Sequence, residues 1–322
     1  MSYKFRVLIT DRAWPDCDVE RQILSQVDAE IVEAPSSDET TLVELARDVD
    51  AIATCWANVT EAVVRAAPRC RIIARFGIGL DNIAVPVASE LGIPVTYVPD
   101  YCVEEVADHT LALVLACARN VGIFHQQSKA GIYDRGAGVP LRRLSELTVG
   151  LIGFGRIGRT VFRKAQALGM NVVAHSRRND DGGTGCRMLA LNELLQAADF
   201  VSLHCPATDE TRGMMSASAF RQMKSSAWLI NTSRGSLVNH ADLWEAIQTE
   251  TIAGAALDVF DPEPPDLSQP LFRHERVIVT PHAAFLSHES LLELRTRTAT
   301  QVAQAIQGKR PAHVVNPHVY DD

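Results

Sequence analysis

Short apolar runs alternate with stretches of helical periodicity along almost the whole chain. In the first hundred residues, helices are predicted between the runs at 18–27, 40–48 and 60–67. The apolar runs that predict strands lie at 5–9, 30–32, 51–53, 72–74, 95–97, 149–152, 172–174, 200–204, 227–231, 254–258 and 277–280. Strands that alternate with helices favour parallel sheets covered by helices on both faces.

Two longer helices are predicted, at 103–120 and from about His288 to Gln307, with a less regular segment at 121–146. We therefore expect an α/β protein with two doubly wound parallel-sheet domains, Rossmann-like or flavodoxin-like, and the active site in the cleft between them. Residues 1–100 plus 286–322 form the predicted substrate domain. Residues 101–285 form the predicted dinucleotide-binding domain, and the two long helices are the predicted crossovers.

The strand at 149–152 leads into a glycine-rich turn, a helix and a second strand, which is the order that a dinucleotide-binding unit requires. Gly153 permits the tight turn, and Gly155 lets the backbone approach a pyrophosphate. Free N–H groups at the start of the helix would stabilise that pyrophosphate. Gly158 lets the helix pack close to the strand. A lone glycine fingerprint is often only a turn, but its strand–helix–strand context favours a nucleotide site.

The second strand of this unit ends in Ser176, Arg177 and Arg178. An NAD site usually has an acidic residue there, which holds the ribose 2′-hydroxyl. A carboxylate would repel a 2′-phosphate, whereas a hydroxyl and two guanidinium groups can bind one. We therefore predict that NADP is preferred, with NAD as the alternative. Solvated charges at a strand end are the other interpretation of the two arginines.

Three later strands end in polar side chains, and in an open parallel sheet those ends face the ligand crevice. They supply Arg234, Glu263 and His282. Reduction of a 2-oxo acid by hydride transfer needs these types of residue. A guanidinium binds the carboxylate and polarises the carbonyl, and a histidine donates the proton. A carboxylate beside the histidine favours the imidazolium form and orients the ring.

Composition narrows the class of protein. The 322 residues carry a net charge of −8 and are 47% hydrophobic, which argues against general nucleic-acid binding and suits a cytoplasmic protein. The N-terminus resembles a first strand, and no apolar run is long enough to span a membrane. The seven cysteines lack a Cys-x-x-Cys pair, so reduced thiols are expected, and no metal-ligand spacing is present.

The motifs GFGRIG, HCPATDETRGM, NTSRG, LDVFDPEP and TPHAA stand in an order that resembles the D-isomer-specific 2-hydroxyacid dehydrogenase family. RFGIGLDNI and TPHAAFLSHES look most similar to the branch that contains the C-terminal binding proteins. The resemblance covers nearly the whole chain. It implies hydride transfer between NADP(H) and a small 2-oxo acid such as glyoxylate or hydroxypyruvate, giving a D-2-hydroxy acid. It also implies a homodimer with residues 119–146 as its arm.

The resemblance assigns a role to each matching residue. Arg234 matches the substrate-binding arginine, Glu263 the glutamate paired with the catalytic histidine, and His282 the general acid/base. Arg75, Ile78 and Gly79 match positions that contact the substrate. The cofactor is expected to contact Thr110, at the start of a helix, and Gly153, Gly155, Arg156, Ile157, Gly158, Ser176, Arg177, Arg178, His204, Cys205, Pro206, Thr232, Asp258 and Ala284.

Several alternatives stay open at this point. A structural ion pair is an alternative role for Arg75, and capping of the next turn is one for Asp258. His109 has no supporting constellation, so a surface or structural role is expected for it. Phe285 stands where the C-terminal binding proteins carry tryptophan, so their pocket cannot be copied. A cofactor-sensing corepressor is the alternative function; a methyltransferase would leave Arg234, Glu263 and His282 unexplained.

Overall fold

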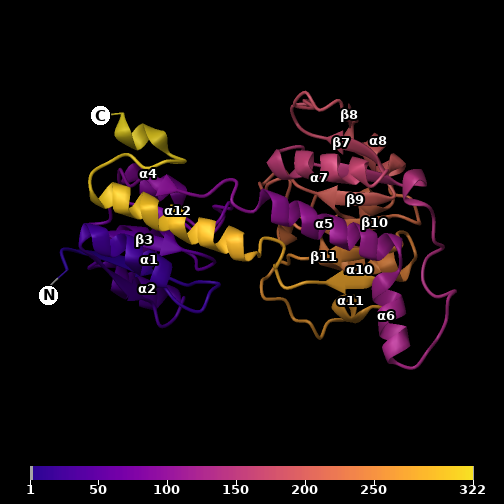
Figure 1. The fold of residues 1–322 in the computed structure, drawn as a ribbon, viewed down its shortest axis with the longest axis horizontal. Helices are drawn as coiled ribbons and strands as arrows, with labels where there is room; N and C mark the ends of the chain where they lie inside the picture. The colour runs from indigo at the N-terminus through magenta and orange to yellow at the C-terminus, as the bar shows by residue number, and fades with distance from the viewer. Residues whose placement is uncertain (1–2, 322) are drawn as a thin grey trace. The chain divides into compact units, whose positions relative to one another are not determined.

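Contacts in the computed structural model, which describes residues 3–321, divide the chain into two units. Unit 1 comprises Met1–Tyr101 and Ser287–Asp322, so both ends of the chain belong to it. Unit 2 comprises Cys102–Leu286. Figure 1 shows the C-terminal helix, in yellow, lying against the N-terminal elements of unit 1.

Unit 1 is built on a five-stranded sheet in the order β2-β1-β3-β4-β5, in which every pair of neighbours is parallel. This is the flavodoxin-like order, whose switch point lies between β1 and β3. Its strands are β1 (Phe5–Ile9), β2 (Ala29–Glu33), β3 (Ala51–Thr54), β4 (Ile73–Arg75) and β5 (Val95–Thr96). Its helices are α1 (Asp18–Leu24), α2 (Glu39–Ala46), α3 (Glu61–Arg65), α4 (Val85–Glu90) and α12 (His288–Ile306).

Alternate residues of each central strand face the two helical layers of unit 1. Leu8 of β1 packs in one cluster with residues of α2, α3 and α4. Its neighbour Val7 packs in another with Leu24 of α1 and Val302 of α12. These strands are buried on both faces of the sheet, which explains why their sequences are continuously apolar instead of alternating between apolar and polar residues.

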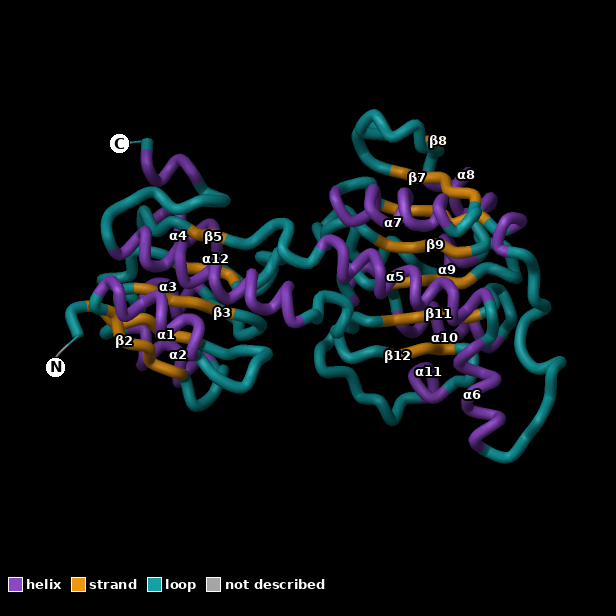
Figure 2. The backbone as a smooth tube through the Cα atoms, viewed as in Figure 1, coloured by secondary structure: helices purple, strands orange, loops and turns teal. Residues whose placement is uncertain are grey.

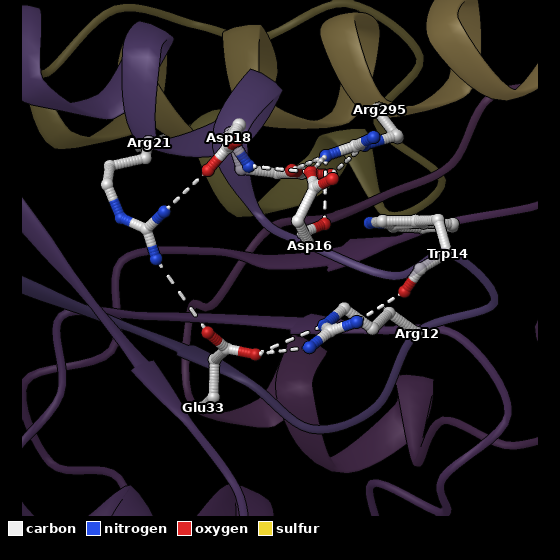
Figure 3. Close-up of polar contacts among 8 residues, drawn as sticks. Arg12, Trp14, Asp16, Asp18, Arg21, Glu33 and Arg295 are labelled. Atoms are coloured by element: carbon white, nitrogen blue, oxygen red, sulfur yellow. Dashed lines mark hydrogen bonds and ion pairs between the residues drawn. The ribbon is translucent and has the colours of Figure 1, made fainter.

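A polar network fastens α12 to α1 and to the loop that follows β1 (Figure 3). The Arg295 guanidinium donates Nε and Nη2 to the two oxygens of Glu20, at 2.9 and 2.8 Å, and Nη2 also reaches Asp16 at 2.9 Å. Glu20 is buried, and the guanidinium also lies 5.3 Å over the Trp14 ring. A buried carboxylate of this kind depends on its partner, so this pair couples the C-terminal helix to unit 1.

Unit 2 is built on a seven-stranded parallel sheet in the order β12-β11-β10-β9-β6-β7-β8, shown edge to edge in Figure 2. The order reverses between β6 and β9, as in a Rossmann sheet. Its strands are β6 (Thr148–Ile152), β7 (Asn171–His175), β8 (Arg187–Met188), β9 (Phe200–Leu203), β10 (Trp228–Asn231), β11 (Gly254–Leu257) and β12 (Val277–Val279). Two parallel sheets confirm the predicted fold class.

Helices cover both faces of this sheet. Val149 and Leu151 pack with the apolar positions of α5 and α7, whereas Ile152 and Val201 pack with those of α8, α9 and α10. The helices of unit 2 are α5 (Val103–Ala118), α6 (Val121–Lys129), α7 (Arg156–Ala167), α8 (Leu191–Ala197), α9 (Ala217–Phe220), α10 (His240–Gln248) and α11 (Pro270–Arg273).

The predicted helix at 103–120 is shorter than expected. It ends at Ala118, and Asn120 follows with a φ of 51° in the left-handed region, after which α6 begins in a new direction. The segment at 121–146 was expected to be irregular, so α6 was missed. Among residues 3–321 no single helix is long and apolar enough to cross a membrane; α5 and α6 reach that length and composition only together, with a bend of 65°.

Candidate active site

The glycine-rich turn follows β6 at the switch point of the unit 2 sheet. Gly153 has a φ of 99°, and a Cβ there would lie 2.5 Å from the carbonyl group of His204. A Cβ on Gly158 would overlap the carbonyl oxygen of Gly153. A Cβ on Gly155, in contrast, would meet no atom within 4 Å. Gly153 and Gly158 are therefore required by the close packing of the backbone, whereas Gly155 leaves the backbone at the start of α7 exposed.

The segment that follows β9 lies against this turn. His204 accepts or donates a hydrogen bond at 2.9 Å between its Nε2 and the Ser202 hydroxyl. Burial lowers the pKa of His204 to about 4, so its ring is neutral at physiological pH. Cys205 accepts a hydrogen bond from Ser233 at 2.7 Å through its backbone carbonyl, and Pro206 is exposed. The segments that follow β9 and β10 are thus joined by a direct hydrogen bond.

The end of β7 leaves a buried hydroxyl without a partner. Among the described residues the Ser176 Oγ has no hydrogen-bond partner although it is buried. Arg177 and Arg178 follow it and are exposed, and Arg177 lies 3.8 Å from the Glu210 carboxylate. An unsatisfied buried hydroxyl beside two solvated guanidinium groups is the local chemistry of an anion site.

The Arg234 loop follows β10 and is fixed by Asn231. The Asn231 side chain accepts from the Ser233 amide at 3.1 Å and donates to the Arg234 carbonyl at 2.9 Å. A Cβ on Gly235 would overlap the backbone of Phe260, so only glycine lets this loop lie against the segment after β11. Arg234 is thereby held beside the segment that carries Glu263.

Glu263 connects two parts of the site through its two oxygens. Its Oε1 accepts from the Phe260 amide at 2.7 Å, and its Oε2 lies 2.8 Å from Nδ1 of His282. Burial alone would raise the pKa of Glu263, but the hydrogen bonds from His282 and Phe260 and the charge of Arg234 lower it below its usual value. Because Glu263 is ionised, His282 donates through Nδ1, which leaves Nε2 for proton transfer.

Asp258 holds the turn that presents His282. It is completely buried, and its carboxylate accepts from the amides of Ala283 and Ala284 at 2.8 and 3.0 Å. Its backbone carbonyl accepts from the His282 amide at 2.8 Å. His282 has a φ of 50°, and its ring meets Phe285 edge-on at 5.9 Å. Capping of this turn, which the sequence left as an alternative for Asp258, is present.

Thr110 was expected at the start of its helix, but it lies in the middle of α5. It is the eighth residue of α5 and completely buried. Its hydroxyl donates to the Val106 carbonyl at 2.7 Å and lies 2.9 Å from the hydroxyl of Thr232. The pair joins α5 to the end of β10, because the helix begins at Val103 and carries Thr110 down to that strand.

His109, for which no constellation was found in the sequence, belongs to this site. Its Nε2 lies 3.0 Å from the Thr280 hydroxyl and 3.6 Å from Asp258 Oδ1. The contact depends on how α5 packs over β10 and β11. A histidine one residue before Thr110, on the same helix as a predicted cofactor contact, was the only signal in the sequence.

Unit 1 carries the remaining predicted residues at the carboxyl end of β4. Arg75 is 8% exposed, one guanidinium nitrogen donates to the Phe76 carbonyl, and its Nε has no partner among the described residues. Gly77 has a φ of 151°, and a Cβ there would lie 2.8 Å from the guanidinium. Ile78 and Gly79 continue this loop and are half-buried. No carboxylate pairs with Arg75 in residues 3–321, so the ion pair that was its alternative role is absent there.

A Rossmann sheet with a glycine turn at its switch point and a histidine–glutamate pair at neighbouring strand ends defines a dinucleotide-dependent oxidoreductase. Residues 111–284 match the model of the "D-isomer specific 2-hydroxyacid dehydrogenase, NAD binding domain". The chain belongs to this family, whose members act on CH–OH donors.

Known proteins are similar to this chain over most of its length. The glyoxylate reductase of Korarchaeum cryptofilum is 38% identical, covering 89% of this chain and 88% of that protein. C-terminal-binding protein 1 of Caenorhabditis elegans is 32% identical over 94% of this chain and 44% of its own length. The NADPH-dependent glyoxylate/hydroxypyruvate reductase of Sinorhizobium meliloti, solved with NADP and malonate, has a TM-score of 0.85 at 30% identity, covering 97% of both chains.

Proposed function

We propose that this protein reduces small 2-oxo acids, in the size class of glyoxylate and hydroxypyruvate, to D-2-hydroxy acids with NADPH, and catalyses the reverse reaction with NADP. The observation that carries the proposal is the pair between His282 Nδ1 and the Glu263 carboxylate, at 2.8 Å, beside the Arg234 loop. A histidine whose Nδ1 is held by a carboxylate, and a guanidinium beside it, are the groups that reduction of a 2-oxo acid requires.

The residues of unit 2 fit a dinucleotide. The open space at Gly155 leaves room for a pyrophosphate at the start of α7, with Arg156 and Ile157 as the first residues of the helix. The Ser176 hydroxyl is a buried donor in need of an acceptor at the end of β7. When the dinucleotide is bound, its nicotinamide supplies the hydride that reduces the carbonyl carbon. His204–Pro206 would contact the adenosine side, and Thr232, Asp258 and Ala284 the nicotinamide side.

The side chains of unit 2 then account for the rest of the reaction. Arg234 binds the substrate carboxylate and polarises the carbonyl at C2. The carbonyl oxygen takes the proton from His282 Nε2 as the new C–H bond forms, and the imidazole is left neutral. Glu263 stabilises the imidazolium before this transfer and keeps Nδ1 protonated after it. In oxidation, His282 removes the proton of the substrate hydroxyl.

We also assign recognition of the substrate anion to Arg75 and to the backbone of Ile78 and Gly79. A guanidinium that is 8% exposed, with one nitrogen unsatisfied and no carboxylate partner among the described residues, carries an uncompensated charge. Burying such a charge is costly unless an anion binds to it. Arg75→Leu is expected to raise the KM for the oxo acid more than it lowers kcat.

The assignment of NADP rests on Ser176, Arg177 and Arg178. A charge-assisted hydrogen bond contributes about 1.5–3 kcal/mol, so losing the contacts of both guanidinium groups with a 2′-phosphate lowers the affinity for NADPH by at least about 10- to 100-fold. Affinity for NADH, which lacks this phosphate, is expected to change little.

The test is a panel of 2-oxo acids assayed with NADPH and with NADH. Glyoxylate and hydroxypyruvate are expected to be reduced, with a higher kcat/KM for NADPH. The Arg177→Ala, Arg178→Ala double variant is expected to lose that preference, and the exposed Arg47→Ala variant is the matched control. Equal efficiency with NADH would refute the cofactor assignment. Reduction of no 2-oxo acid would refute the reaction.

We further propose that the protein is a homodimer whose arm is residues 119–146. Four large apolar side chains in this segment are between 43% and 83% exposed: Val121, Ile132, Tyr133 and Leu141. Exposed apolar groups that gather in one segment are typical of interaction surfaces. Sedimentation equilibrium is expected to give a dimer, and charged replacements at Ile132 and Tyr133 a monomer.

A further inference from the structure

His109 contacts a buried carboxylate at the centre of the unit 2 site. Asp258 has no exposed surface, and its acceptor atoms are occupied by the Thr280 hydroxyl at 2.5 Å and by the amides of Ala283 and Ala284. His109 Nε2 lies 3.6 Å from the same carboxylate. Within residues 3–321, His109 is the one ionisable partner of Asp258. A buried carboxylate without a lysine or arginine depends on every donor around it.

The hydrogen bonds among His109, Thr280 and Asp258 can be arranged in only one way. Thr280 has a single hydroxyl hydrogen, which it donates to Asp258. The contact of 3.0 Å between Thr280 Oγ1 and His109 Nε2 must therefore be a hydrogen bond from the histidine. His109 carries its proton on Nε2, and the order of donation runs from His109 to Thr280 to Asp258.

The series of hydrogen bonds ends at the turn that presents His282. Asp258 holds the amides of Ala283 and Ala284 with its side chain and the amide of His282 with its backbone carbonyl. His282 lies in the left-handed region, with a φ of 50°, which a non-glycine residue adopts only where its surroundings hold it. Displacement of the Asp258 carboxylate would thus move the residue that carries the acid–base nitrogen.

We propose that His109 is a positioning residue for the acid–base step. It acts through Thr280 and Asp258 to hold the turn at 281–284, and so fixes where His282 Nε2 lies. This role in catalysis rests on the proposed function, whereas the hydrogen-bond chain itself exists in the unliganded protein. His109 does not bind the oxo acid, so its loss is expected to change kcat and leave the KM for glyoxylate within twofold.

The test uses three replacements of His109 that differ in where they place a donor. The amide nitrogen of Gln reaches the position of Nε2, that of Asn only the position of Nδ1, and Leu has no donor. His109→Gln is expected to keep kcat within threefold of the wild type. His109→Leu and His109→Asn are expected to lose about tenfold, the effect of one hydrogen bond to a charged network. The exposed His318→Leu is the matched control.

Two further measurements separate this role from a general loss of structure and from failure of the proposed function. His109→Leu combined with Thr280→Val is expected to be no slower than Thr280→Val alone, because both break the same chain. In amide NMR spectra of the unliganded protein, Ala283 and Ala284 are expected to shift in His109→Leu and to stay near their wild-type positions in His109→Gln.

The proposal is overturned if His109→Leu keeps kcat within twofold, if His109→Gln is as slow as His109→Leu, or if the Ala283 and Ala284 resonances do not respond. An inactive wild-type protein would refute the proposed function, and the NMR comparison would still decide whether His109 positions the turn.

Discussion

Replacement of Glu263 by Gln removes one negative charge and almost no volume. The amide oxygen can still accept from the Phe260 backbone, as Glu263 Oε1 does at 2.7 Å. The amide nitrogen would then face His282 Nδ1, where the carboxylate oxygen now lies at 2.8 Å. Because that nitrogen only donates, it favours the neutral imidazole with Nδ1 as the acceptor. The variant keeps the fold of the segment and changes the form of the histidine.

The size of the effect follows from the kind of hydrogen bond that is lost. A hydrogen bond to a charged group contributes about 1.5–3 kcal/mol, and one between neutral groups about 0.5–1.5 kcal/mol. The difference, about 1–2 kcal/mol, corresponds to a reduction of roughly 5- to 30-fold in the rate of glyoxylate reduction. The effect should be in kcat, because Glu263 stabilises the proton donor and does not bind the oxo acid.

The assay is steady-state oxidation of NADPH with glyoxylate across a range of pH. We expect kcat for glyoxylate to fall in Glu263→Gln across this range, since the amide nitrogen cannot accept the hydrogen bond that His282 Nδ1 now donates. The exposed Glu44→Gln is the control for loss of a charge elsewhere. A Glu263→Gln enzyme that keeps its kcat within twofold of the wild type across this range would refute the role given to this carboxylate.

Three further predictions concern other parts of the molecule. Arg295→Met leaves the Glu20 carboxylate buried without its partner, so the free energy of unfolding in urea should fall by about 3–5 kcal/mol, and an unchanged midpoint would contradict this. The pKa of His204 is about 4 in the folded state and about 6.5 in the unfolded state, so the unfolded state binds the proton first; stability should fall between about pH 6.5 and 4, and less so in His204→Gln. Gly155→Ala should leave the melting temperature unchanged and weaken NADPH binding in a fluorescence titration. Because Gly153 has a φ of 99°, Gly153→Ala should lower both the melting temperature and the affinity for NADPH.

The alternation of strands and helices predicted most of the fold because apolar runs buried on both faces need helices on both sides. The strand at 5–9 was predicted with the bounds that it has, and the strand at 200–204 is one residue shorter than expected. The helix α6 was missed because residues 121–129 are mostly polar, and its direction depends on the left-handed backbone of Asn120. The local pattern of apolar residues does not indicate such a break in a helix.

From the sequence, the site could be predicted only for those residues that directly follow predicted strands. The family resemblance paired Glu263 with His282, and in the structure these residues follow β11 and β12, which are neighbours in the sheet. His109 could not be placed in the site, since its contact with Asp258 and Thr280 comes from the packing of a helix that is distant in sequence. For the same reason, the burial of Thr110 and of the Arg75 guanidinium appears only in the tertiary structure.

His282→Asn tests whether His282 is the general acid of 2-oxo acid reduction. Asparagine tolerates the left-handed backbone at this position, where φ is 50°, and cannot donate an acidic proton. The measurement is kcat for glyoxylate with NADPH, with the melting temperature and the Kd for NADPH determined on the same samples. The variant is expected to lose roughly 100-fold or more in kcat, with the melting temperature and the Kd for NADPH unchanged. A folded variant that binds NADPH and turns over at nearly the wild-type rate would contradict it.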